Sequence, residues 1–350
     1  MKLPDFPWDS LAPYGEKAKK FSAGFIDLSQ GTPVDATPKF IQDAFTKAAN
    51  SPSYPLTAGT AELREVLKNW ASQKLGATGE FDVLPTIGSK ELVAWLPTFL
   101  QSKKVLYPEI AYPTYLVGSK ISGAQSEAVG IDASKWPSAD LAWINSPANP
   151  TGQVQSEEQL QAVISWARAN DAVVASDECY LSFTNQAKSI LAVAKGDNHN
   201  LLAVHSLSKR SNLAGYRAAF IIGDAKLISQ IREIRKHAGM MVPLPVQKAM
   251  IAALSDEIHV AEQAKRYNDR RTILRTALEK IGFEVKFSEA GLYIWCTKNE
   301  DCWKTVDWFA DHGVLVTPGS FYGELGNKFV RIALTATDEN IKQVAERISK

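Results

Sequence analysis

Two kinds of hydrophobic pattern alternate along the chain from about residue 36 to residue 223. Apolar residues recur at helical spacing in some segments, whereas others are short Val- and Ile-rich runs typical of buried strands. The pattern predicts helices at Pro38–Ala49, Ala61–Leu75, Glu91–Leu100, Glu157–Ala169 and Lys226–His237. It predicts strands at Val83–Ile87, Lys104–Tyr107, Leu141–Asn145, Ala172–Ser176, Leu201–His205 and Ala218–Ile222. Such alternation indicates an α/β fold, with βαβ units and a mostly parallel sheet covered by helices on both faces.

The pattern changes in the last third of the chain. A long helical stretch, Ile258–Ile281, is followed by shorter strand-like runs and one further helix. The runs are Glu284–Phe287, Leu292–Cys296, Val314–Val316 and Val330–Leu334, and the helix is Cys302–Asp311. We therefore expect an N-terminal segment (1–35) packed with a small domain, a large domain (36–245), and a linking helix with the smaller α+β domain (246–350).

Composition and charge exclude several classes of protein. The chain has 350 residues, of which 45% are hydrophobic and 22% charged, and its net charge is +1. Nine Trp and fourteen Phe need a buried core, which argues against a disordered chain. The near-neutral charge gives no electrostatic reason to expect nucleic acid or an acidic membrane surface as a partner. The longest apolar stretches, such as Val93–Leu100, are too short to span a membrane.

Cysteine and histidine usage points to a reducing compartment. Three cysteines, Cys179, Cys296 and Cys302, cannot build a disulfide framework in a chain of this length. No CxxC or HExxH pair is present, so we expect no metal site. The segment Met1–Ser10 lacks the apolar run of a signal peptide. These features predict a cytoplasmic protein.

Polar residues follow three consecutive predicted strands. The run Asn145–Gly152 contains Asn149, the next strand leads into Asp177 and Tyr180, and the third leads into Lys209. Each feature alone has an ordinary structural interpretation: an Asn-Pro turn, a helix-capping aspartate, and a solvated lysine. Because the carboxyl ends of parallel strands meet at one ligand crevice, we expect these side chains to lie together.

Together these residues suit the chemical groups of one ligand. A lysine desolvated near other positive charges is a nucleophilic amine that can take an aldehyde. Asp177 suits a protonated ring nitrogen, and Ser206, Ser208 and Arg217 suit a phosphate. Pyridoxal 5′-phosphate carries all three groups, and its protonated ring is an electron sink for a carbanion at the substrate's α-carbon.

Two further contacts with this cofactor are expected. Asn149 and Tyr180 would hydrogen-bond the phenolate oxygen of the ring. Ser89 and Lys90 follow Gly88 at the start of a predicted helix, where backbone amides form an anion site for the phosphate. The Gly-Ser-Lys triplet is not a Walker loop, because no GxxxxGK[ST] surrounds it.

One competing motif is set aside. Ser206 and Lys209 also fit the S-x-x-K pair of penicillin-binding enzymes. That site requires S-D-N and K-T-G motifs as well, and the chain contains neither.

Over essentially its whole length the chain resembles the class I/II aminotransferases, which have the fold type I of pyridoxal-phosphate-dependent transferases. The resemblance rests on Asn149–Gly152, Asp177-x-x-Tyr180, and Ser206-x-Ser-Lys209 with Arg217. It extends to Tyr54–Gly59 with Leu63-Arg64, Tyr112–Tyr115, and Pro318-Gly319 through Gly323 to Arg331.

The resemblance implies roles for single residues. Lys209 would carry the cofactor and then act as base and acid in the proton shift, while Asp177 would pair with the ring nitrogen. Arg331 would hold the substrate α-carboxylate as a bidentate fork, assisted by the Gly31 backbone and Asn149.

Further roles follow from the same resemblance. Either Tyr112 or Ile110 would cover the cofactor ring, since this segment is one residue longer than usual. Tyr54 would reach the phosphate of a neighbouring subunit, which implies a homodimer with shared active sites. Tyr293 and Tyr322 are weaker candidates for the pocket, and Cys179 is interpreted as a packing residue.

Several stretches are similar to the short bacterial N-succinyldiaminopimelate aminotransferases (EC 2.6.1.17) of lysine biosynthesis. They are Leu3–Ala18, Leu84–Thr98, Lys209–Arg217, Arg235–Gln247 and Asp301–Gly323. This similarity implies amino-acid and 2-oxo-acid substrates, with glutamate donating its amine to N-succinyl-2-amino-6-oxopimelate. Arg210, Lys236 and His237 are candidates for the distal end of that substrate, and are equally well explained as ordinary helix or surface charges.

Other functions remain open at this stage. An aspartate or aromatic aminotransferase, or a pyridoxal-phosphate-dependent lyase, would need the same residues, because they hold the cofactor and the α-carboxylate common to all. A regulator fused to a DNA-binding module is disfavoured by the near-neutral charge and by the lack of a helix-turn-helix pattern in Met1–Asp35. A catalytically inactive binding protein would be expected to lose Lys209.

Overall fold

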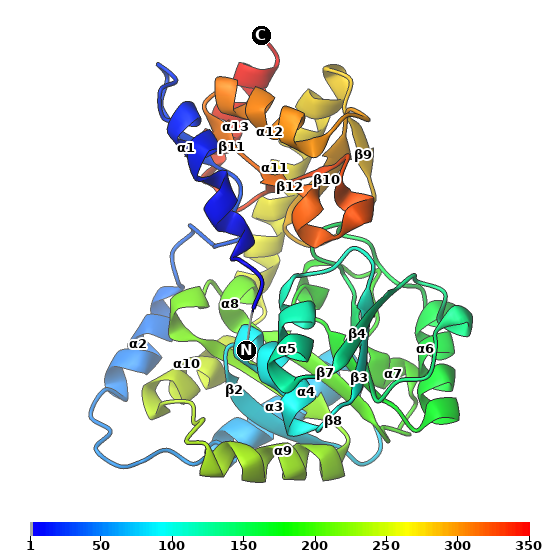
Figure 1. Cartoon of the computed structure of the whole chain (residues 1–350). Helices are drawn as coiled ribbons and strands as arrows, with labels where there is room; N and C mark the ends of the chain where they lie inside the picture. The colour runs from blue at the N-terminus through cyan, green and yellow to red at the C-terminus, as the bar shows by residue number, and fades with distance from the viewer. Residues whose placement is uncertain (1–2) are drawn as a thin grey trace.

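Seven strands form the main sheet of the computed structural model, which describes residues 3–350 (Figure 1). In spatial order they are β2 (Asp82–Ile87), β8 (Ala218–Gly223), β7 (Leu201–Ser206), β6 (Val173–Asp177), β5 (Leu141–Asn145), β3 (Lys104–Pro108) and β4 (Gln125–Val129). Strand β8 is antiparallel to both of its neighbours, and every other adjacent pair is parallel. The expected mostly parallel α/β sheet is thus confirmed.

Helices cover both faces of this sheet, which explains why its central strands are continuous apolar runs. Every residue of β5, β6, β7 and β8 is buried. One face packs against α3 (Ala61–Trp70), α6 (Glu157–Asn170), α7 (Ile190–Val193) and α10 (Leu244–Leu254). The other packs against α4 (Ser89–Phe99), α5 (Thr114–Ser122) and α9 (Ala225–His237). The short helix α8 (Leu207–Arg210) follows β7 directly, and α2 (Lys39–Lys47) packs on α10.

Helix α6 illustrates how local sequence determines where one of these elements begins. Ser156 accepts a hydrogen bond from the backbone of Gln159, whose side chain accepts one from the backbone of Ser156. This capping box satisfies two donors at the start of the helix. One stripe of the helix then faces the sheet through Leu160, Val163, Ile164 and Ala167.

A smaller unit lies at the top of Figure 1. Its antiparallel sheet has the order β12 (Thr317–Pro318), β13 (Val330–Ala333), β10 (Tyr293–Thr297) and β9 (Glu284–Lys286). Around it lie α11 (Ile258–Lys280), α12 (Cys302–Asp311) and α13 (Asp338–Ile348). The N-terminal segment joins this unit, because β1 (Ile26–Asp27) pairs with β11 (Val314–Leu315) and α1 (Ala12–Ala18) packs on α12. A 3-10 turn, η1 (Pro7–Leu11), leads into α1.

The division of the chain into 1–35, 36–245 and 246–350 stays a prediction. Helix α10 packs on α2 and α3, and its buried residues from Val246 to Leu254 belong to the core of the main sheet. We propose on this packing that the second boundary falls after Leu254. Within residues 3–350, no helix is both long and apolar enough to cross a membrane.

Candidate active site

A cavity of about 800 Å³ opens where the carboxyl ends of β5, β6 and β7 meet the smaller sheet and the N-terminal segment. It brings together twelve of the site residues expected from the sequence. They are Gly31, Ser89, Lys90, Tyr112, Asn149, Asp177, Tyr180, Ser206, Ser208, Lys209, Arg217 and Arg331. Residues from most of the chain length therefore converge on one site.

Lys209 reaches this cavity from α8, directly after β7. Its Nζ donates a hydrogen bond to the backbone carbonyl of Gly31, and within residues 3–350 it forms no ion pair. Burial lowers the pKa of Lys209, and the positive charges of Arg331 and Arg217 act in the same direction. A lysine in these surroundings has a larger neutral fraction and is a better nucleophile.

Asp177 ends strand β6 and is almost fully buried. Its Oδ2 accepts a hydrogen bond of 2.8 Å from the Tyr115 hydroxyl, and its Oδ1 accepts one of 3.2 Å from the backbone N–H of Cys179. Burial raises the pKa of Asp177, and the hydrogen bonds from Cys179 and Tyr115 oppose that rise. A buried carboxylate with no cation paired to it in residues 3–350 suits a cationic group of a ligand.

The loop after β5 is held by side-chain hydrogen bonds. Asn145 Nδ2 donates to the carbonyl oxygens of Asp177 (2.8 Å) and Pro147 (3.1 Å), and its Oδ1 accepts from the backbone N–H of Asn149 (2.7 Å). These contacts fix the loop against strand β6. They leave the Asn149 side chain at the cavity.

Arg331 is a buried cation without a carboxylate partner. It is 2% exposed and donates to Asn149 Oδ1 (2.9 Å), to the Ser29 carbonyl and to Thr317 Oγ1 (3.4 Å). The Tyr293 ring lies 4.2 Å from the guanidinium carbon. Within residues 3–350 its Nε has no hydrogen-bond partner and its charge has no ion-pair partner. Such a group suits a small anion.

A cradle for a second anion lies at the start of α4. Gly88 precedes the helix with φ 77°, and no side chain among residues 3–350 caps the helix N-terminus. A Cβ at Gly88 would lie 2.2 Å from Nη2 of Arg217, so only glycine allows this approach. Ser89 and Ser206 line the same cavity. Free helix amides, hydroxyls and a guanidinium are the groups that bind phosphate.

Three of the four tyrosines described next line the cavity, and the fourth is buried behind it. Tyr112 lines the cavity, and burial raises its pKa to about 12, whereas Ile110 lines a separate cavity. The hydroxyls of Tyr180 and Tyr293 are 3.1 Å apart, and both residues line the cavity. Tyr322 is buried behind it, with its ring 5.2 Å from the Arg331 guanidinium carbon.

Four residues singled out from the sequence lie elsewhere. Tyr54 is 93% exposed and does not line the cavity of its own chain. Arg210 is buried against α10 and pairs with Glu257, and Lys236 and His237 lie on α9, at the opposite end of the large unit in Figure 1. Arg210, Lys236 and His237 therefore do not line the cavity of their own chain, and their role at the distal end of a substrate stays a prediction.

The structure adds residues that the sequence did not reveal. Phe6 and Trp8 from the N-terminal segment, together with Phe321, form an aromatic wall of the cavity. Aromatic side chains in a Pro-containing segment carry no local signal for such a position. Tyr115 stands three residues after Tyr112 within a motif of the family, yet nothing in the sequence indicates its contact with Asp177.

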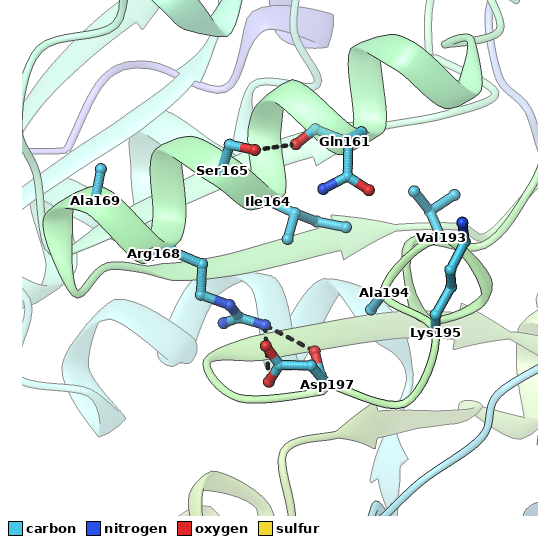
Figure 2. A pocket seen from close by; sticks show the side chains of 9 residues that line it. All are labelled: Gln161, Ile164, Ser165, Arg168, Ala169, Val193, Ala194, Lys195 and Asp197. Atoms are coloured by element: carbon cyan, nitrogen blue, oxygen red, sulfur yellow. Dashed lines mark hydrogen bonds and ion pairs between the residues drawn. The ribbon is translucent and has the colours of Figure 1, made fainter.

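A second hollow lies apart from this site, between α6 and α7 (Figure 2). Arg168 and Asp197 form an ion pair of 3.3 Å there, and Ser165 Oγ donates to the Gln161 carbonyl at 2.9 Å. None of the site residues expected from the sequence lines it. Its contacts tie α6 to the loop before β7 and do not suggest chemistry.

Comparison with known proteins agrees with this arrangement. Residues 20–348 match the family described as aminotransferase class I and II. The chain is 47% identical to the 4-dedimethylamino-4-oxo-anhydrotetracycline transaminase OxyQ of Streptomyces rimosus, over 99% of both chains. It is also 47% identical to the probable aminotransferase Rv1178 of Mycobacterium tuberculosis, over 99% of this chain and 85% of that one.

A comparison with a solved structure supports the same fold. The fold matches that of a probable N-succinyldiaminopimelate aminotransferase from Thermus thermophilus with a TM-score of 0.90. The two sequences are 25% identical, and the match covers 98% of this chain and 99% of the other.

Proposed function

Because this chain belongs to the class I and II aminotransferases, we propose that it acts as a succinyldiaminopimelate transaminase (EC 2.6.1.17). Glutamate would give its amino group and leave as 2-oxoglutarate. N-succinyl-2-amino-6-oxopimelate would receive it and become N-succinyl-LL-2,6-diaminopimelate, a step of lysine biosynthesis. The observation that carries the transamination of an α-carboxylate substrate is Arg331, a buried guanidinium with no carboxylate partner in residues 3–350. The choice of the succinylated diacid rests on the similarity to N-succinyldiaminopimelate aminotransferases.

Enzymes of this family have fold type I and use pyridoxal 5′-phosphate, and the cavity fits that cofactor. When bound, the cofactor supplies an electron sink for the α-carbon of the amino acid. Lys209 would hold its aldehyde, and Asp177 would pair with its ring nitrogen. Asn149 and Tyr180 would bind its phenolate oxygen, and Tyr112 would cover the ring. The phosphate would lie among Ser89, Lys90, Ser206, Ser208 and Arg217.

In this proposal four residues act on the substrate. Arg331 grips the α-carboxylate of each amino acid and 2-oxo acid in turn, and Asn149 and the Gly31 backbone assist it. Lys209 Nζ takes the proton from the substrate's Cα and later returns one, and burial lowers its pKa, which enlarges the neutral fraction that can accept a proton. The Lys209–Gly31 hydrogen bond keeps Nζ close to the bound carboxylate.

The size and lining of the cavity support a long substrate. Its volume is about 800 Å³, and it is lined in part by apolar side chains of α4, α5 and the N-terminal segment, which can cover the methylene groups of a pimelate chain. Lys90 also lines the cavity and forms no ion pair within residues 3–350. With its backbone amide assigned to the phosphate at the start of α4, its side chain is available to a distal carboxylate. The name of the Thermus thermophilus relative points to the same substrate.

A second candidate substrate has an observation in its favour. The wall of Phe6, Trp8 and Phe321 is aromatic, as a ring-bearing amino acid or ketone would require. The Streptomyces rimosus relative is named a 4-dedimethylamino-4-oxo-anhydrotetracycline transaminase. An aspartate aminotransferase or a lyase would use the residues described above without needing this wall.

We also propose a homodimer with shared active sites. Tyr54 is available to a neighbouring subunit because it is almost fully exposed, and Leu56 beside it is 64% exposed. Phe40 and Ile258, which line one surface cavity, are exposed apolar residues as well. A second copy of the chain would cover such residues, and Tyr54 would contact the phosphate bound to that copy.

Steady-state kinetics with a panel of amino donors would test the substrate. N-succinyl-LL-2,6-diaminopimelate, aspartate and phenylalanine would each be assayed with 2-oxoglutarate as acceptor. The proposal expects kcat/KM for the succinylated diacid to exceed the values for aspartate and phenylalanine by about 100-fold or more, corresponding to ~2.7 kcal/mol of additional transition-state binding. A preference for phenylalanine would favour the second candidate and overturn the first.

A further inference from the structure

We propose that Tyr115 is a positioning residue for Asp177: its hydroxyl keeps the carboxylate ionised and aims it at the ring nitrogen of the cofactor. The inference rests on the proposed role of Asp177, and it adds a residue that the family resemblance did not assign. Tyr115 does not line the catalytic cavity, so it would act only through Asp177.

The contact joins two elements of the large unit. Tyr115 lies in the first turn of α5, and its hydroxyl meets Asp177 Oδ2 at 2.8 Å, across 62 residues of sequence. The other carboxylate oxygen accepts from the backbone N–H of Cys179 at 3.2 Å. Within residues 3–350, Tyr115 is the one residue whose side-chain hydroxyl donates a hydrogen bond to this carboxylate.

The tyrosine ring is held from two sides. Trp143 stacks on it with ring centroids 5.1 Å apart and an interplanar angle of 23°, and Tyr112 meets its edge at 5.9 Å and 86°. Tyr115 itself is 0% exposed. Because the ring cannot turn within this packing, the direction of its hydroxyl is fixed, and so is the position of the oxygen that it binds.

The direction of the hydrogen bond follows from the chemistry of the two groups. An ionised carboxylate can only accept, so the hydroxyl must donate. Burial strongly raises the pKa of Tyr115, which therefore keeps its proton at neutral pH. Burial also raises the pKa of Asp177, which favours its neutral form, and a donor directed at the ionised form opposes that effect. Without it, Asp177 would pair less firmly with a protonated ring nitrogen.

The test uses Tyr115→Phe, which removes the hydroxyl and keeps the ring. The cofactor bound to Lys209 absorbs visible light, and the absorbance changes as its nitrogen linkage loses a proton. A positive ring nitrogen lowers the pH midpoint of that change. If Tyr115 supports the charge on Asp177, the variant should shift the midpoint upward by about one pH unit, the size expected for one hydrogen bond to a charged group.

A second readout is the retention of the cofactor. Dilution of the loaded enzyme should release cofactor from the variant with a dissociation constant about tenfold higher than from the wild type. Neither measurement needs a substrate, so the result does not depend on which amino acid the enzyme prefers.

Tyr267→Phe is the matched control. Tyr267, on α11, is also buried, but its ring packs against Phe183, and its hydroxyl has no hydrogen-bond partner in residues 3–350. Loss of that hydroxyl should leave the pH midpoint unchanged. Circular dichroism of all variants would establish that each is folded.

Asp177→Asn tests the proposed role of Asp177 separately from that of Tyr115. If Asp177→Asn and Tyr115→Phe both raise the midpoint, the inference holds. If Asp177→Asn raises it and folded Tyr115→Phe does not, Tyr115 has no positioning role and the inference is overturned. If Asp177→Asn leaves the midpoint unchanged, the proposed role of Asp177 fails, and the inference fails with it.

Discussion

The Arg331 guanidinium donates a hydrogen bond of 2.9 Å to Asn149 Oδ1, although 182 residues separate the two in sequence. Arg331 stands on strand β13 of the small sheet, and Asn149 lies in the loop after β5 of the main sheet. The guanidinium proposed to bind the substrate carboxylate is thus oriented by a contact between the two sheets. An acid bound at Arg331 would reinforce that contact.

The first prediction concerns the fork of Arg331. Arg331→Lys keeps the charge but loses the planar pair of donors. We expect KM for the amino donor and for the 2-oxo acid to rise together, each by about 30-fold, corresponding to ~2 kcal/mol for lost charge-assisted hydrogen bonds. Steady-state kinetics with both substrates varied would measure this.

Arg168→Lys is the control for that substitution. Arg168 pairs with Asp197 in the hollow of Figure 2, away from the cavity, so both KM values should stay as in the wild type. An Arg331→Lys enzyme with unchanged KM for both substrates would show that the carboxylate is held elsewhere.

A second prediction follows from the close packing of Gly31. A Cβ at this position would lie 2.1 Å from the Tyr293 hydroxyl, so Gly31→Ala must displace either the ring or the backbone carbonyl that accepts from Lys209. A displacement of that size next to the reacting groups should lower kcat/KM by about 100-fold.

Gly15→Ala is a fair comparison, because the nearest atom to its new Cβ would be 3.8 Å away, an ordinary contact. That variant should retain full activity. Equal activities of Gly31→Ala and Gly15→Ala would mean that the Gly31 carbonyl and Tyr293 are not needed in their observed positions.

A third prediction uses the pH dependence of stability. Burial raises the pKa of Asp177 in the folded, cofactor-free protein, so its carboxyl stabilises the fold when protonated. That contribution is present at low pH and is lost as the pH rises through the raised pKa. Asp177→Asn has no such proton to lose. The free energy of unfolding of Asp177→Asn should therefore exceed that of the wild type by more at pH values of about 7.5 than near pH ~4.

Urea unfolding of both cofactor-free proteins at several pH values would test this. The variant would be more stable than the wild type at neutral pH and yet inactive, as expected where a functional carboxylate lacks its partner. A stability difference that does not change with pH would contradict the assigned burial effect.

The fourth prediction concerns shared active sites. In a mixed dimer, one Lys209→Ala subunit and one Tyr54→Ala subunit would build one complete site, because Lys209 and Tyr54 would come from different chains. We expect the mixture to be more active than either variant alone after subunit exchange. Activity equal to the average of the two unmixed variants would argue against a site completed by Tyr54 from the neighbouring chain.

Much of the fold was predictable because its elements are bounded by clear polar turns. The observed β5, Leu141–Asn145, and α12, Cys302–Asp311, have the expected bounds, and α11 ends one residue early. Strand β4 was missed because its sequence, Gln125–Val129, is mostly exposed at the sheet edge and carries no apolar run. The reversed direction of β8 was not predictable, since hydrophobic periodicity says nothing about the direction of a strand.

The residues of the site also divide into those that could be predicted from the sequence and those that could not. Asn149, Asp177 and Lys209 could be grouped because each follows a parallel strand, and sheet topology alone brings such ends together. Arg210 could not be placed from its charge, because its partner, Glu257, lies 47 residues later in the sequence and outside the cavity. The aromatic wall from Phe6 and Trp8 depends on how the N-terminal segment returns to the cavity, which no local pattern encodes.

The most direct test of the account follows the bound cofactor through each half of the reaction. Glutamate or N-succinyl-LL-2,6-diaminopimelate, added alone to the yellow enzyme, should convert the visible absorbance to that of the aminated cofactor. Addition of 2-oxoglutarate should then restore it, and Lys209→Ala should show neither change. An enzyme that consumes these amino acids without storing their amine on the cofactor, or that leaves its spectrum unchanged with both, would contradict transamination at this site.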